Sequence, residues 1–267
     1  MKGIVIDRKF MLQKYPPQLI HTPMQKITIA STSGNNLDAT LITPPGTKPS
    51  GKAVLFIHGW MGDQDSQILR ALPAAENGYI CLTFSLSGHG KSAGSIERLT
   101  RRNYLDDVIS AYDFLKSQKE VDADNITVVS ASFGGYLAAL LSHERKARAL
   151  LLRVPANYPD EGFDTLPQFS YVRNNANAHV WKQSPLKYTE TRALQAVHDY
   201  PRNIFIVESG RDAVIPHQTV QNYVDAVKDK SKLIYHVQPN ADHNLSNENH
   251  LHEFIQMLTD WLRQAEA

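Results

Sequence analysis

The chain has 267 residues, of which 42% are hydrophobic and 21% charged, the composition of an ordinary globular protein. This length suffices for one large α/β domain with a sizeable core, or for two small domains. The 28 basic and 27 acidic side chains leave a net charge of +1, so we expect neither a nucleic acid nor a membrane as partner. The single cysteine, Cys81, excludes an intrachain disulfide, and its apolar neighbours predict a buried structural thiol.

The amino-terminal segment does not have the pattern of a signal peptide. Residues 1–20 begin with a basic side chain, but Asp7, Arg8 and Lys9 interrupt the apolar stretch that a signal peptide needs. No stretch of the chain approaches the roughly 20 apolar residues that span a membrane. We therefore expect a cytoplasmic protein.

The first predicted elements are two strands. Residues 25–30 and 37–42 alternate as strands do, and a turn rich in serine, glycine and asparagine separates them. Such a pattern predicts an antiparallel hairpin.

From residue 53 onward, short apolar runs alternate with helical segments. Continuous apolar runs are typical of strands that are covered on both faces, as in a parallel sheet. The runs are residues 53–57, 79–84, 126–129, 149–152, 204–207 and 233–237. Helices are predicted between them, for example over residues 103–115, and residues 250–267 form a final amphipathic helix. This alternation predicts a single α/β domain over residues 1–267, built on a mostly parallel, doubly wound sheet.

One segment interrupts the alternation. Between residues 155 and 201 no strand is evident, and proline, asparagine and aromatic residues are frequent. The segment is too long for an ordinary connection, so it is either a functional lid or a disordered excursion. Its aromatic residues favour a packed lid insertion over about residues 156–200. The lid side chains predicted to contact substrate are Tyr158, Phe163, Phe169 and Trp181.

Residues 128–141 (VVSASFGGYLAALL) predict a strand, a tight turn and a helix, with a serine at the turn. A serine there projects above the carboxyl edge of the sheet, where ligands bind in open α/β folds. The turn requires small residues two positions before and after the exposed serine. Ser132 has Ser130 and Gly134 at those positions, whereas Ser130 would have the bulky Val128. Ser132 is therefore the candidate nucleophile.

A serine nucleophile needs a base and an acid, which in this kind of fold follow it in the order acid, then histidine. Asp212 follows the apolar run 204–207, and His243 follows the run 233–237. The three residues at three strand ends, in this order, predict a catalytic triad. Two alternatives remain open: Asp212 could cap the next helix, and Asp242 is a rival acid.

A negatively charged oxygen in the transition state needs two backbone N–H donors. We assign them to Phe133, the residue after the nucleophile, and to Trp60, in the loop after the first buried strand. His58, in the same loop, is expected to be a structural hydrogen-bonding residue. His250 and His252, with His243 and Asp242, match no regular zinc-ligand spacing, so no metal is expected. We expect no cofactor either.

Five segments together resemble the α/β-hydrolase superfamily: HGWMG (58–62), SLSGHGKSAG (85–94), SASFGG (130–135), SGRDAVIP (209–216) and ADH (241–243). In style they are similar to the branch of serine esterases and acyl-aminopeptidase-like hydrolases that includes feruloyl (cinnamoyl) esterases. The resemblance runs from about Lys26 to the end of the chain. It implies an α/β-hydrolase fold with Ser132, Asp212 and His243 as nucleophile, acid and base. Ser130 departs from the usual glycine, and Gly90-Lys91-Ser92 lacks the first glycine of a phosphate-binding loop.

These observations predict a serine hydrolase that cleaves carboxylic esters of small to medium acyl substrates through an acyl-enzyme. Two other functions stay open: amide or peptide hydrolysis by the same residues, and ligand binding by a hydrolase scaffold without activity. The small-molecule substrate itself and the oligomeric state are not determined by the sequence.

Overall fold

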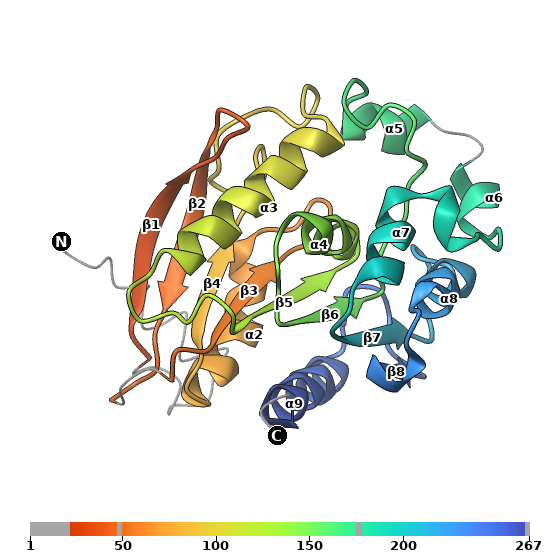
Figure 1. Ribbon diagram of the computed structural model, residues 1–267. Helices are drawn as coiled ribbons and strands as arrows, with labels where there is room; N and C mark the ends of the chain where they lie inside the picture. The colour runs from red at the N-terminus through yellow and green to blue at the C-terminus, as the bar shows by residue number, and fades with distance from the viewer. Residues whose placement is uncertain (1–21, 47–49, 175–177, 265–267) are drawn as a thin grey trace.

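The computed structural model describes residues 22–46, 50–174 and 178–264. Its centre is an eight-stranded sheet in the order β1-β2-β4-β3-β5-β6-β7-β8 (Figure 1). The strands are β1 Met24–Ala30, β2 Asn36–Ile42, β3 Ala53–Ile57, β4 Ile80–Phe84, β5 Ile126–Ala131, β6 Ala149–Arg153, β7 Asn203–Ser209 and β8 Leu233–Gln238. Residues 1–20, for which the sequence predicts no signal peptide, lie outside the described residues.

The predicted hairpin and parallel strands are both confirmed. β1 and β2 pair antiparallel with Met24 opposite Ile42, and β2 pairs antiparallel with β4. Every other neighbouring pair in the sheet is parallel. All residues of β3, β4 and β6 are buried, which explains why their sequences are almost entirely apolar; the exceptions are Thr83 in β4 and Arg153 at the end of β6.

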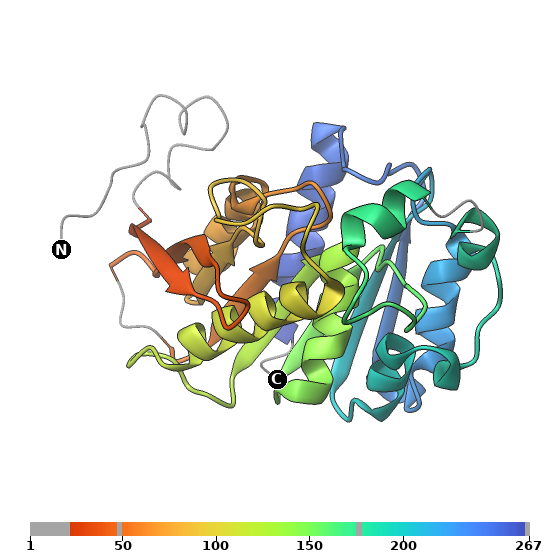
Figure 2. The same cartoon turned by 90° about the horizontal axis from the view of Figure 1, so that it is seen from above.

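Helices cover both faces of the sheet. Their bounds are α2 Gln64–Glu76, α3 Arg101–Lys116, α4 Phe133–Glu144, α5 Gln168–Asn174, α6 Ala178–Lys182, α7 Arg192–Asp199, α8 His217–Ala226 and α9 Glu248–Gln264. Two short 3-10 turns, η2 Tyr188–Glu190 and η3 Lys230–Lys232, complete the described elements. One core lies between the sheet and α3, α4, α7 and α8, and the other between the sheet and α2 and α9. Figure 2 shows α9 on the side of the sheet opposite α3 and α4.

The final helix and the cysteine also match their predictions. Phe254, Leu258, Trp261 and Leu262 of α9 are buried against the sheet. Cys81 is fully buried in β4, and burial raises the pKa of its thiol. Within the described ranges, no helix combines the length and apolar character that crossing a bilayer demands.

A buried carboxylate in α3 that sequence reasoning did not identify connects the turn of the hairpin to the loop after β4. Asp107 in α3 accepts hydrogen bonds from the hydroxyls of Ser31 at 2.6 Å and Ser33 at 2.7 Å, and from the N–H of Ser87 at 2.8 Å. Burial raises the pKa of Asp107, while these three donors oppose that rise. The carboxylate therefore ties the β1–β2 turn to the loop after β4.

In its described residues, the segment between β6 and β7 contains α5, α6, η2 and α7 and no named strand. α7 is strongly amphipathic, and its Ala193, Leu194 and Val197 are buried in the same core as α4. α5 and α6 lie outside α7, near the edge of the molecule (Figure 1). Packing of this segment against the domain agrees with its aromatic composition, and its action as a lid stays a prediction.

Candidate active site

Ser132 lies at a strained turn between β5 and α4. Its φ of 55° and ψ of −120° fall in a region that residues other than glycine rarely adopt. The backbone around it imposes this conformation: the Ser132 N–H donates to the Arg153 carbonyl at 2.9 Å, and its carbonyl accepts from the N–H of Ala156 at 2.9 Å. Strain maintained by surrounding contacts in this way is typical of functional positions. The residue is half-buried and lines a pocket.

The residues around this turn must be small because other chain segments pass very close. A Cβ on Gly134 would lie 2.5 Å from the His58 carbonyl oxygen and 2.6 Å from that of Ile57. Ser130, where a glycine is usual, is accommodated because its hydroxyl donates to the Leu151 carbonyl at 2.9 Å across β5 and β6. That hydroxyl is buried and engaged, which leaves Ser132 as the reactive candidate of the two.

The structure brings Asp212 and His243 together, although 31 positions separate them in sequence. His243 Nδ1 donates to Asp212 Oδ2 at 2.7 Å, while Oδ1 accepts from the N–H groups of Val214 and Ile215, both at 2.8 Å. The Asp212 side chain is only 2% exposed and that of His243 15%. With Nδ1 as donor, His243 presents Nε2 as its free nitrogen.

Backbone contacts between the loops after β7 and β8 produce this pairing. The N–H of Gly210 donates to the Gln238 carbonyl at 2.8 Å, and the N–H of Arg211 donates to the Ala241 carbonyl at 2.9 Å. A side chain at Gly210 would place its Cβ 2.5 Å from the Pro239 carbonyl oxygen, so glycine is required there. The rival acid, Asp242, accepts instead from the N–H of Ser246 at 2.8 Å.

The loop after β3 lies directly beside the serine. A Cβ on Gly59 would be 3.1 Å from Ser132 Cβ, and the ring of Trp60 packs edge-on against Phe133 with centroids 5.4 Å apart. Phe133 is the first residue of α4, where backbone N–H groups have no acceptor within the helix. The two residues assigned from the sequence as backbone donors are therefore in contact through their rings, and their role in catalysis stays a prediction.

His58 maintains the shape of this loop, as expected. Its Nδ1 donates to the Gly59 carbonyl at 2.7 Å, and its Nε2 accepts from the N–H of Leu86 at 2.9 Å. The second bond requires the neutral ring, because a protonated Nε2 cannot accept. Burial lowers the pKa of His58 from its ordinary value of 6.5 to about 4, which keeps the ring neutral at neutral pH.

This buried imidazole predicts a loss of stability in acid. The unfolded chain binds a proton at this residue near pH 6.5 and the folded chain only near pH 4, so stability falls as the pH drops between these values. His58 alone contributes about 3 kcal/mol to that fall. We expect urea unfolding of His58→Gln, followed from pH 7 to pH 4, to have a shallower pH dependence than that of the wild type. Parallel curves would show that His58 is not the titrating group.

The serine, the histidine and two arginines share one pocket. Its volume is about 270 Å³, and it lies between the loop after β3, the start of α2 and the loop after β8. The lining residues are Gly59, Trp60, Gly62, Ser66, Gln67, Arg70, Ala131, Ser132, Arg153, His243 and Asn244. Sequence reasoning missed Arg70 and Arg153. A signal existed for Arg153, since it is a charge at the carboxyl end of an apolar strand, where ligands bind in this kind of fold.

The four predicted lid residues occupy different places. Tyr158 is buried and packs edge-on against Phe133 with centroids 5.8 Å apart, one residue from the serine. Phe163 is buried away from the pocket, and Phe169 and Trp181 are half-buried. None of the four lines the described pocket of Ser132, and their contact with substrate stays a prediction.

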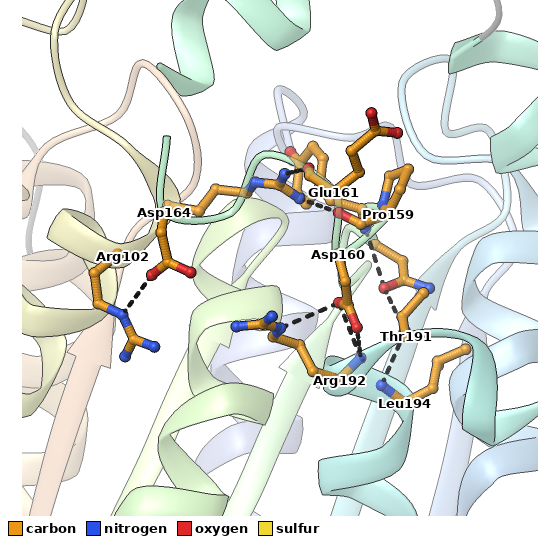
Figure 3. A network of polar contacts seen from close by, with 11 residues as sticks. Arg102, Pro159, Asp160, Glu161, Asp164, Thr191, Arg192 and Leu194 are labelled. Atoms are coloured by element: carbon orange, nitrogen blue, oxygen red, sulfur yellow. Dashed lines mark hydrogen bonds and ion pairs between the residues drawn. The ribbon is translucent and has the colours of Figure 1, made fainter. Parts of the chain in front are cut away.

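A network of polar contacts anchors the first part of this segment (Figure 3). The backbone N–H of Arg192 donates to the Asp160 carboxylate at 3.1 Å, and the Arg192 guanidinium lies 3.3 Å from the same carboxylate. Arg102 contacts Asp164 at 3.1 Å. Phe163 lies between these charges, with the guanidinium of Arg192 4.1 Å from its ring centroid. The buried Arg101 donates to the carbonyls of residues 159 and 161. The chain near Tyr158 is thus held on α3 and α7.

Within the part of the chain that the structure describes, no three His, Cys, Asp or Glu side chains come close enough to hold a metal ion. The groups that gather at Ser132 are a hydroxyl, an imidazole with its carboxylate, backbone amides and guanidinium groups. This set can perform nucleophilic chemistry by serine.

Known proteins similar to this chain include a peptidase, esterases and uncharacterized proteins. An uncharacterized protein of Mycobacterium tuberculosis is 26% identical over 201 residues, which are 73% of this chain and 64% of that protein. Dipeptidyl-peptidase 5 of Porphyromonas gingivalis is 23% identical over 220 residues, 76% of this chain but 31% of that protein. The chain therefore spans less than two thirds of the length of these relatives.

Among solved structures, Est1E of Butyrivibrio proteoclasticus with bound ferulic acid superposes with a TM-score of 0.70. The match has 20% sequence identity and covers 90% of this chain and 98% of Est1E. At this identity the likeness establishes the α/β-hydrolase fold. The sequence profile of the prolyl oligopeptidase family (Peptidase_S9) matches residues 64–266, most of the chain. On this match, the chain belongs to the prolyl oligopeptidase family of α/β-hydrolases.

Proposed function

We propose that the chain is a serine hydrolase that cleaves carboxylic esters of small to medium acyl groups. The observation that carries the proposal is the 2.7 Å hydrogen bond between His243 and Asp212 at the pocket that Ser132 lines. A serine at a strained turn, beside a histidine oriented by a carboxylate, is the arrangement that generates an alkoxide-like nucleophile.

In the proposed first step, Ser132 Oγ forms a bond to the ester carbonyl carbon while His243 Nε2 takes the hydroxyl proton. Asp212 accepts from Nδ1 of the same ring, which stabilises the imidazolium that forms. The backbone N–H groups of Trp60 and Phe133 donate to the carbonyl oxygen as it becomes negative. The bond to the alcohol oxygen then breaks, and the imidazolium gives its proton to the departing alkoxide.

In the proposed second step, water attacks the acyl-enzyme. His243 Nε2 takes a proton from the water, a bond forms from the water oxygen to the carbonyl carbon, and the bond to Ser132 Oγ breaks. The proton returns to Ser132, and the carboxylic acid leaves. The overall reaction consumes one ester and one water and yields one acid and one alcohol.

Amide or peptide hydrolysis is the second candidate. It is favoured by the family match and by the similarity to dipeptidyl-peptidase 5. An amide makes a further demand on the same groups, because its nitrogen must be protonated as the C–N bond breaks. We rank esters first because ester hydrolysis demands less of the catalytic groups than amide hydrolysis, and the residues at the site are sufficient for it.

The test combines a covalent probe with a substrate panel. We expect a fluorophosphonate to label Ser132 in the folded protein, and 4-nitrophenyl esters of rising chain length to be hydrolysed. Aryl esters and aminoacyl 4-nitroanilides in the same panel separate the two candidates: a preference for the anilides would favour the peptidase. A folded protein that neither reacts with the probe nor hydrolyses any of these compounds would be a binding protein on a hydrolase scaffold.

A further inference from the structure

The pocket beside Ser132 carries positive charge that the proposed reaction does not use. Arg70 of α2 and Arg153 at the end of β6 both line it, and no aspartate or glutamate is among its described lining residues. Apart from Ser132, His243 and the indole of Trp60, the other polar side chains that line it are those of Ser66, Gln67 and Asn244, which are neutral. The pocket is thus cationic at the place where a substrate would lie.

Arg153 is buried without a carboxylate partner among the described residues. It is 3% exposed, and its guanidinium donates to Ser209 Oγ at 3.1 Å and to the His243 carbonyl at 2.5 Å. Its Nε atom is buried and has no hydrogen-bond partner within the described ranges. Asp212 and Asp242 act on Arg153 only through space, since neither forms an ion pair with it in that part of the chain.

Burial of a guanidinium without a carboxylate beside it is costly, and a second cation increases the cost. Both effects act on Arg153. Burial is the larger cause that lowers its pKa, and the nearby Arg70 lowers it further. An anion in the pocket would offset the desolvation and the repulsion together. Guanidinium groups pair especially well with carboxylates, through two parallel N–H···O bonds.

We propose that the pocket beside Ser132 binds a carboxylate carried by the substrate, so that the preferred substrates are esters with a negative charge near the ester bond. The inference rests on the proposed function for its reaction and adds a substrate class. The charge could belong to the acyl group or to the alcohol, because the pocket adjoins both Gly59 beside the serine and His243, which would protonate the alcohol. No chemical step is added to the ester hydrolysis described above.

Arg153 also holds the backbone of His243, and this alone would be a positioning role. The two roles differ in their consequences. Loss of a positioning contact lowers kcat/KM equally for charged and neutral esters, whereas loss of a carboxylate-binding group lowers it for charged esters only. The ratio between matched substrates is therefore the informative quantity.

Two matched pairs of substrates test the inference. On the acyl side, 4-nitrophenyl hydrogen adipate is compared with 4-nitrophenyl hexanoate, and on the alcohol side 3-(butyryloxy)benzoate is compared with its methyl ester. We expect the anionic member of at least one pair to have a kcat/KM about tenfold or more higher at low ionic strength. In Arg70→Gln and Arg153→Gln that ratio should fall about tenfold. Arg148→Gln removes the same charge just before β6, at the opposite end of the strand, and should keep the wild-type ratio.

Calorimetry provides a second readout that does not depend on catalysis. Adipate should bind to Ser132→Ala protein more tightly than hexanoate, and should lose this advantage when Arg70→Gln is added. Ratios at or below one for both pairs, with neutral esters still hydrolysed through Ser132, would overturn the inference and leave the proposed function intact. No ester hydrolysis together with selective adipate binding would overturn the function and support the pocket. Arg70→Gln keeps the test valid if Arg153→Gln does not fold.

Discussion

Ser132→Ala is expected to lower kcat for 4-nitrophenyl esters by about 10⁴- to 10⁶-fold, because the only proposed nucleophile is removed. Residual hydrolysis would come from the backbone donors at Trp60 and Phe133, which can still stabilise a negative oxygen. The variant should remain folded, since alanine is smaller than serine and the backbone bonds from Ser132 to Arg153 and Ala156 do not use the side chain. The measurement is steady-state hydrolysis at saturating ester, with thermal unfolding as the check on folding.

The matched control is Ser130→Ala, two residues earlier and within β5. Its hydroxyl donates to the Leu151 carbonyl, so we expect a stability loss of about 1 kcal/mol and a kcat close to that of the wild type. Activity of Ser132→Ala within tenfold of the wild type would show that the nucleophile has been wrongly assigned. Loss of activity in Ser130→Ala alone would assign that role to the buried serine instead.

Asp212→Asn is expected to lower kcat by about 10⁴-fold while the fold is retained. The amide oxygen can still accept from the N–H groups of Val214 and Ile215, but the amide nitrogen would face His243 Nδ1 as a donor. The imidazole would then carry its proton on Nε2, where it cannot accept the proton of Ser132. Hydrolysis of 4-nitrophenyl butyrate across pH 6–9 measures the effect.

Asp242→Asn is the matched control, because this carboxylate precedes His243 directly but accepts from the N–H of Ser246. It should hydrolyse the ester at nearly the wild-type rate. A large loss in Asp242→Asn and a small one in Asp212→Asn would identify Asp242 as the acid that orients the histidine. Equal small losses would mean that neither carboxylate sets the tautomer of the ring.

Local patterns predicted the strands well because burial on both faces leaves a direct mark in sequence. Residues 53–57 are all apolar, and the predicted strand has the same first and last residues as β3. Residues 192–199 were not recognised as a helix, because the proline, asparagine and aromatic residues around them dominate the composition of the segment. Their burial against α4 depends on partners distant in sequence, which no local pattern contains.

Chain order and spacing alone identified Ser132, Asp212 and His243 as candidates, because each follows an apolar strand and the carboxyl ends of parallel strands share one edge of a sheet. Only the tertiary structure decided that His243 pairs with Asp212 and not with Asp242, since that choice depends on how the loops after β7 and β8 contact each other. The cationic pocket likewise required the fold. Arg70 and Arg153 belong to different elements, one in α2 and one at the end of β6, and a local pattern cannot report charges that meet only through packing.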